Sequence, residues 1–181
     1  NDPWHGSKGI IFEGGARVPY FVYWKGVIEP QVFEKAVNTL DAGATAVALA
    51  GSDPSKDSML DGVDLMPFLT GKDQRDPHRY IYQRYMNTAA VISGKYKFMA
   101  HENGEELLFD VSLAAPGQHD ADKEFHETVN LINERPEKAA ELRRALAAWK
   151  NELPVPRYEG GYHDSLVDFI EKRWGFREPA E

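Results

Sequence analysis

Apolar and polar positions follow different patterns along the chain, beginning with two apolar runs. Residues 9–12 are mostly apolar and predict a short strand. Residues 18–24 are almost wholly apolar, which is typical of a strand buried on both faces. From Glu34 to Leu49 the apolar residues recur at helical spacing, and Gly51 follows as a stop signal. Strands followed by a helix predict the tail of a larger layered α/β sheet domain.

The pattern then changes to short apolar runs. Residues 52–78 are polar and read as a linker, with one helical turn expected within 63–69. Closely spaced runs with turn residues between them predict an antiparallel meander, and these runs are residues 79–83, 89–93, 96–100 and 106–110.

Two helices are expected after the meander. One opens at Pro136 and ends before Pro154, with large apolar residues on one face. A second is capped by residues 164–165. The predicted fold is therefore the end of an α/β domain followed by an α+β part, a small antiparallel sheet packed with a helix. The apolar helix residues are Leu142, Leu146, Trp149, Leu166, Phe169, Ile170 and Trp174.

Composition narrows the class of protein. The 21 basic and 29 acidic residues give a net charge of −8, which argues against a nucleic-acid partner. The absence of cysteine excludes disulfides and thiolate metal sites. No apolar stretch approaches the roughly 18 residues of a membrane span. Composition and periodicity name no chemistry.

Residues 6–19 read GSKGIIFEGGARVP and resemble the G-x-K-G-x-x-(Y/F)-E-G-G-x-R-V-P signature of the sulfatase family, in the alkaline phosphatase superfamily. Departures from the family are Ala44, where proline is usual, Ile92-Ser93, where arginine is common, and a longer segment at 111–126. Residues 154–181 match nothing in the family. Further resembling blocks follow in the family's order, at residues 41–51, 61–71, 89–98, 106–110 and 127–149.

The resemblance implies a domain organisation. Residues 1–71 would form the C-terminal end of the α/β catalytic domain, residues 72–153 a small sheet-plus-helix subdomain, and residues 154–181 a C-terminal extension with a helix. It also implies a partner, the N-terminal portion of the same sulfatase. Alone, the chain would expose residues 18–24 and so bind a partner polypeptide or aggregate.

Sulfatases hydrolyse sulfate esters with a formylglycine made from Cys or Ser in C/S-x-P-x-R, and with a divalent metal, usually calcium. This sequence has no Cys and no Ser-x-Pro-x-Arg. The resemblance thus implies that the nucleophile and the metal ligands lie in the absent N-terminal portion, and that the chain is inactive alone. It implies a sulfated small molecule or glycan as substrate, and a periplasmic or secreted location. Two alternatives stay open, a non-catalytic scaffold module and a phospho- or phosphonate-ester hydrolase.

The matched signature nominates site residues. By resemblance Lys8 contacts the substrate sulfate, for which a compact ammonium with three donors is suited; the alternative is an ordinary solvated lysine. His5 is expected at the pocket edge, or else solvated. Glu13 and Arg17 are expected to pair or to brace the loop that presents Lys8. Residues 14–15, both glycine, are expected to allow a tight turn at positive φ.

Other polar clusters have ordinary interpretations. Residues 119–127 contain potential metal ligands, but without a recognised ligand spacing. Tyr80, Tyr82, Arg84 and Tyr85 are candidates for a substrate groove, although packing on the sheet is the simpler interpretation.

Overall fold

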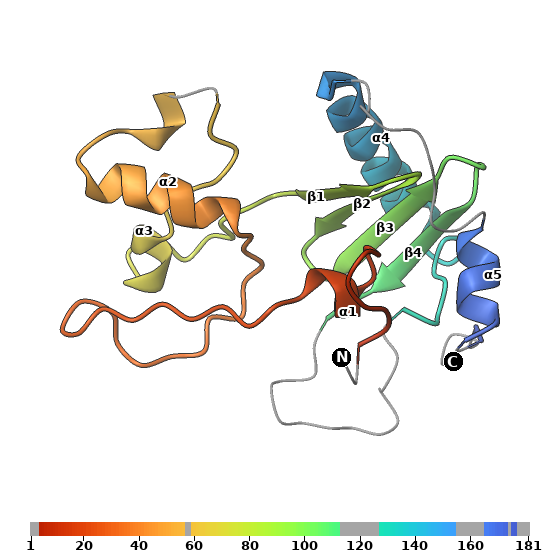
Figure 1. The fold of residues 1–181 in the computed structure, drawn as a ribbon, viewed down its shortest axis with the longest axis horizontal. Helices are drawn as coiled ribbons and strands as arrows, with labels where there is room; N and C mark the ends of the chain where they lie inside the picture. The colour runs from red at the N-terminus through yellow and green to blue at the C-terminus, as the bar shows by residue number, and fades with distance from the viewer. Residues whose placement is uncertain (1–3, 57–58, 113–126, 155–164, 174, 177–181) are drawn as a thin grey trace. The chain divides into compact units, whose positions relative to one another are not determined.

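The computed structural model describes residues 4–56, 59–112, 127–154, 165–173 and 175–176 (Figure 1). It divides the chain into two compact units. The sheet unit combines Asn1–Val18 with Tyr82–Glu181, and the helical unit is Pro19–Ile81. The predicted domain boundaries refer to a complete enzyme and stay a prediction. Among the described helices, none combines the length and apolar character needed to cross a membrane.

A four-stranded sheet forms the centre of the sheet unit, with its strands in sequence order. This confirms the predicted meander. Turn residues at 94–95 and 102–105 separate the last three strands, whose pairings are antiparallel. The strands are β1 (Ile81–Tyr85), β2 (Thr88–Ser93), β3 (Tyr96–His101) and β4 (Glu106–Asp110).

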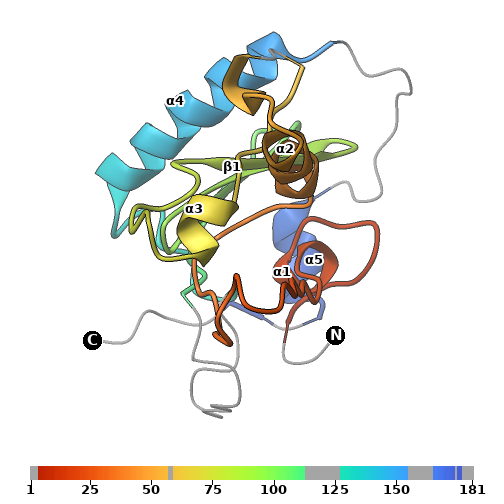
Figure 2. The same cartoon turned by 90° about the vertical axis from the view of Figure 1, so that its left-hand side faces the viewer.

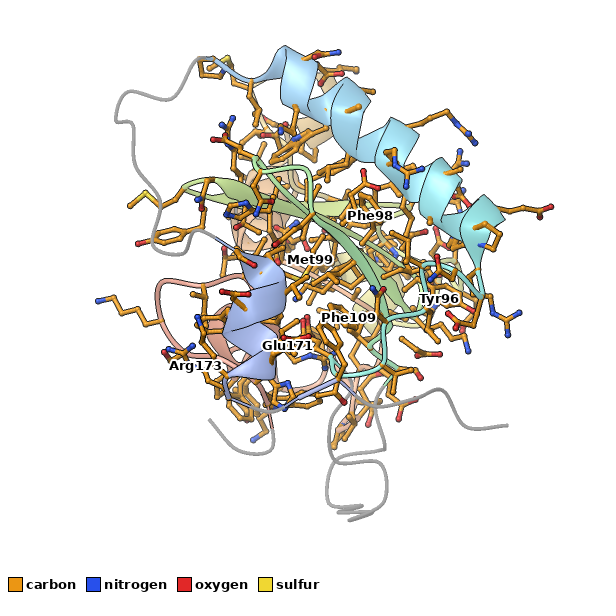
Figure 3. All side chains as sticks on the ribbon, turned by 90° about the vertical axis from the view of Figure 1, so that its right-hand side faces the viewer. Tyr96, Phe98, Met99, Phe109, Glu171 and Arg173 are labelled. Carbon is orange, nitrogen blue, oxygen red and sulfur yellow. The ribbon has the colours of Figure 1, made fainter. Side chains whose placement is uncertain are left out.

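Helices cover both faces of this sheet. Figures 2 and 3 show α4 (Pro136–Glu152) on one side and α5 (Leu166–Glu171) on the other. The short α1 (Glu13–Ala16) lies on the α5 side. Neighbouring strand residues point to opposite faces, so Phe98 and Met99 lie on different sides, and both are fully buried. The α5 side holds the main apolar cluster, which includes Ile11, Phe12, Met99, Leu107, Phe109, Leu166, Phe169 and Ile170.

Helices α4 and α5 follow their predicted starts. Leu142 and Leu146 of α4 are buried, which is worth about 1.5–3 kcal/mol each. Trp149 stacks on Tyr82, with ring centroids 4.9 Å apart, so Tyr82 has a packing role. Ser165 caps α5 by accepting a hydrogen bond from the Asp168 amide at 3.0 Å. The predicted helix residue Trp174 lies outside the described residues.

The helical unit contains α2 (Leu40–Leu49), a 3-10 turn at Pro54–Lys56 and α3 (Met66–Leu69). The turn predicted within 63–69 is confirmed. The start predicted for α2 at Glu34 is wrong, because the Asn38 side chain accepts a hydrogen bond from the Leu40 amide at 2.8 Å. Such a local side-chain contact satisfies a free amide at a helix start.

Both predicted N-terminal strands are wrong in this structure. Residues 9–12 form bends that lead into α1, and Gly9 has φ 90°, which interrupts an extended path. Residues 18–24 join no sheet, and Phe21 is 89% exposed. A strand needs a neighbour for its backbone groups, and the described part of the chain pairs none with either segment.

A buried carboxylate organises the helical unit. Asp41 accepts the Asn38 amide at 2.8 Å and the Val63 amide at 3.0 Å, and its Oδ1 lies 2.8 Å from His78 Nε2. Burial raises the pKa of Asp41, but the hydrogen bonds from His78, Asn38 and Val63 outweigh it and hold the pKa below its usual value. Asp41 therefore joins the start of α2 to two distant segments as an anion.

Asp41→Asn is expected to destabilise the helical unit by about 2–3 kcal/mol, because an amide group then faces backbone donors. Hydrogen exchange of α2 amides measures this, with the exposed Asp61→Asn as the matched control. The native pKa is lowered, so the stabilisation is present above the unfolded pKa and lost as pH falls through the native one. The variant should therefore differ from wild type near pH 7, begin to converge with it below about pH 4, and converge fully only below the lowered native pKa. Equal exchange at pH 7 would contradict this role.

Candidate functional site

The predicted sulfate-binding lysine lies on a closed loop. The Gly14 amide donates to the His5 carbonyl at 2.7 Å, which joins the two ends of residues 5–14, hereafter the Lys8 loop. Within this loop only Ser7 and Lys8 are exposed. The loop therefore presents Lys8 to the surroundings.

The two glycines after Glu13 lie where a larger residue would clash with backbone oxygen atoms. Both Gly14 and Gly15 lie in α1. A Cβ at Gly14 would lie 2.6 Å from the His5 carbonyl oxygen. At Gly15 a Cβ would collide with the Ser7 carbonyl oxygen.

The predicted positive φ at these two positions is wrong. Positive φ occurs instead at Gly6, with φ 89°, and at Gly9, with φ 90°, both within the Lys8 loop. The signature therefore contains glycines of two kinds, two that bend the loop and two that let its backbone approach α1 closely.

A buried ion network lies beneath the Lys8 loop. Lys97 of β3 is fully buried and donates to Glu13 Oε1 and Glu127 Oε1, each at 2.8 Å. It also donates to the Ile11 carbonyl at 2.5 Å. Glu127 Oε2 accepts the Glu13 amide at 2.8 Å. All three Lys97 donors are used, and Glu127 binds both the lysine and the loop backbone.

The charges in this network support one another. Burial raises the pKa of Glu13, but the Lys97 and Arg17 charges outweigh it and lower the pKa. Burial lowers the pKa of Lys97, but the two carboxylates outweigh it and raise the pKa. Burial raises the pKa of Glu127 above its usual value, against the opposing charge of Lys97. The lysine is therefore a cation held by ionised Glu13.

Arg17 completes the network at its outer edge. It forms an ion pair with Glu13, which confirms the predicted pairing of these residues. It also donates to the Val111 carbonyl at 3.3 Å and lies 4.6 Å from the centre of the Trp4 ring. Glu13 is thereby held from two sides, by Lys97 and by Arg17.

The remaining nominated residues have simple positions. His5 is 4% exposed, so it is not a solvated histidine, and its place at a pocket edge stays a prediction. Tyr85 packs against the main apolar cluster. Residues 119–126 lie outside the described residues, whereas Glu127 is engaged with Lys97. Within the described ranges, no three acidic or histidine side chains are grouped to hold a metal ion, so they do not fit the calcium that the resemblance implies.

Sequence reasoning missed Lys97 and the role of Glu127. Strand alternation places Lys97 on the same face as Met99, which is covered by α5. A lysine in a strand between two covered faces requires an acidic partner. That signal was available, but the sequence has 29 acidic residues and does not say which one.

Gly15→Ala is expected to disrupt the Lys8 loop and to lower stability by about 2 kcal/mol or more, because the Cβ meets backbone oxygens. Gly43→Ala is the matched control, since a Cβ there meets nothing within 4 Å. In the α2 interior it should stabilise by about 0.5–1 kcal/mol. Thermal and urea denaturation measure both changes, and two equal effects would disprove the spatial argument.

Comparison with known proteins finds relatives over part of the chain. No family model matches the chain. Over 107 residues it is 37% identical to the uncharacterized sulfatase YdeN of Escherichia coli, covering 55% of the chain and 19% of YdeN. Over 118 residues it is 37% identical to bovine (Bos taurus) arylsulfatase A, covering 62% of the chain and 23% of that protein. The chain thus spans about a fifth of these relatives' length.

Further likenesses extend over more of the chain. It is 23% identical over 152 residues to an N-acetylgalactosamine-6-O-sulfatase of Bacteroides thetaiotaomicron, covering 81% of the chain and 30% of that protein. The solved structure of Ps i-CgsB, in complex with k-i-k-neocarrahexaose, shares the fold with a TM-score of 0.71 at 20% identity, over 96% of this chain and 37% of that one. The chain is therefore similar to sulfatases in sequence, and its partial coverage of each relative fits the C-terminal portion of these proteins.

Proposed function

We propose that this chain is the part of a sulfatase that supplies a sulfate-binding lysine and covers the substrate pocket. The observation that carries the proposal is the exposed position of Lys8 on a closed loop within the matched signature. The relatives support the reaction class, since each is named a sulfatase. In this proposal the formylglycine, the calcium and its ligands belong to the N-terminal portion.

The chemistry of sulfate ester hydrolysis suits a lysine here. Negative charge on the sulfate oxygens must be stabilised while the ester bond breaks, and a preset cation does this without reorganisation. The Lys8 ammonium offers three donors. The chain contains neither Cys nor Ser-x-Pro-x-Arg, so we expect no turnover without the N-terminal portion. The substrate is a sulfated small molecule or glycan.

Lys8→Ala in the protein completed by its N-terminal portion is expected to lower kcat/KM for an aryl sulfate by about 10²–10³-fold, because one cationic donor to the sulfate is lost. The exposed Lys72→Ala is the control for general loss of charge. A colorimetric assay with p-nitrophenyl sulfate gives both values. Equal activity of the Lys8 variant and wild type would refute the role, and an inactive wild type would favour the scaffold alternative.

An exposed apolar segment supports the proposed partner. Large side chains at Phe21 and Tyr23 are 89% and 86% exposed, and four neighbours in the segment are exposed as well. Contiguous exposed apolar residues mark interaction sites. Because the chain spans about a fifth of its relatives' length, we propose that the N-terminal portion of the same protein covers this segment. The neighbours are Val18, Tyr20, Val22 and Trp24.

The chain alone is expected to self-associate through this segment, because its apolar side chains lack the proposed cover. Phe21→Ser/Tyr23→Ser should reduce the self-association and also weaken binding of the N-terminal portion. Met59→Ser removes an apolar side chain of similar exposure, 85%, elsewhere in the helical unit and should change neither. Sedimentation velocity over a concentration series measures this. A wild-type chain that stays monomeric at high concentration would contradict the proposal.

A further inference from the structure

The buried ion network touches the Lys8 loop at its backbone. Lys97 donates to the Ile11 carbonyl and Glu127 accepts the Glu13 amide. Ile11 follows Lys8 by three positions. A side chain that binds backbone groups fixes the path of the chain, whereas a contact between side chains alone fixes only their ends.

We infer that Lys97 and Glu127 are positioning residues that hold the Lys8 loop in one conformation. They attach its second half to β3 and to the residues that precede α4, while the Gly14 amide closes the loop onto His5. The inference rests on the proposed function in one respect only, namely that Lys8 binds sulfate from the position in which the loop holds it. Neither residue is expected to touch substrate.

The surroundings argue for positioning over simple stabilisation. Lys97 shares its sheet face with Met99, and the cluster around Met99 is apolar. In such a place a buried ion pair gives little or no net stability over apolar residues of similar size. Apolar side chains would fill the space but would bind neither the Ile11 carbonyl nor the Glu13 amide. What the charged pair adds is directed contact with the loop.

The charge pattern of the network agrees with this role. Lys97 and Arg17 balance Glu13 and Glu127, so the buried cluster has no net formal charge when all four are ionised. A positioning cluster of this kind offers no surplus cation that would compete with exposed Lys8 for an anion. Removing Lys97 alone would leave two buried carboxylates together, and that variant is expected to unfold readily.

The test therefore replaces the pair as a whole. Lys97→Met/Glu127→Leu keeps apolar volume in the core, and Glu13 retains Arg17. The isosteric Glu127→Gln is the second variant, in case the double variant fails to fold. Leu142→Ala on α4 destabilises the same unit from the opposite sheet face and is the control for general loosening. Amide exchange is followed residue by residue by NMR on the 181-residue chain.

The amides of Glu13 and Gly14 are expected to exchange at least about tenfold faster in the double variant, measured relative to Val91 and Met99 of the sheet. Glu127→Gln should give the same pattern to a smaller extent. Leu142→Ala should accelerate loop and sheet amides together. The inference is overturned if the loop-to-sheet ratio stays at its wild-type value, or if Leu142→Ala changes it equally.

Activity of the completed protein gives an independent reading. With p-nitrophenyl sulfate, the double variant should lose about tenfold or more in kcat/KM at a temperature where it is fully folded. Leu142→Ala should keep wild-type activity there. Unchanged activity in a variant with a loosened loop would overturn the link to Lys8. An inactive wild type would reject the proposed function, while amide exchange still decides the positioning role.

Discussion

The sheet unit depends on one lysine ammonium that is buried between two carboxylates. Lys97 has no exposed surface, so its charge is tolerable only because Glu13 and Glu127 surround it and use its donors. Glu13 comes from the N-terminal signature, Lys97 from the third strand, and Glu127 from the sequence between β4 and α4. Losing Lys97 would leave two buried carboxylates together, and losing either carboxylate would leave the ammonium with a single charged partner. Three distant parts of the sequence must therefore be placed together.

A second constraint acts on the same loop through lack of space. The first helical turn lies so close to the loop that no Cβ fits at Gly14 or Gly15. The ion network binds the backbone at Ile11 and Glu13. Close backbone packing and ionic contacts thus restrict one loop, whose exposed tip carries Lys8. A cation on a restricted loop loses little conformational freedom when it binds an anion, which is the physical benefit of preorganisation.

Local patterns predicted the parts of the fold that local chemistry determines. The four strands and α4 were predicted nearly at their observed bounds, because turn residues separate the strands and a proline opens the helix. Residues 18–24 were predicted as a strand from composition, yet they join no sheet here. The composition of a segment shows that it is suited to burial, but it does not show which other segment will cover it.

The candidate site shows the same division between local and distant information. The resemblance placed Lys8, Glu13 and Arg17 in one signature, and the Glu13–Arg17 pair joins residues one helical turn apart. Lys97 and Glu127 stand 84 and 114 positions from Glu13 along the chain, and no local spacing connects them.

Alternation along β3 was the available signal, since it puts a lysine on the face that also carries Met99. A lysine on a covered face demands an acidic partner, so alternation predicts a buried pair but leaves its second member unidentified. The predicted positive φ at Gly14 and Gly15 was wrong for a different reason. A glycine can be required by a positive φ or by an atom that lies too close for a Cβ, and the sequence does not distinguish the two. Only the fold, which brings the His5 carbonyl against Gly14, separates these two causes.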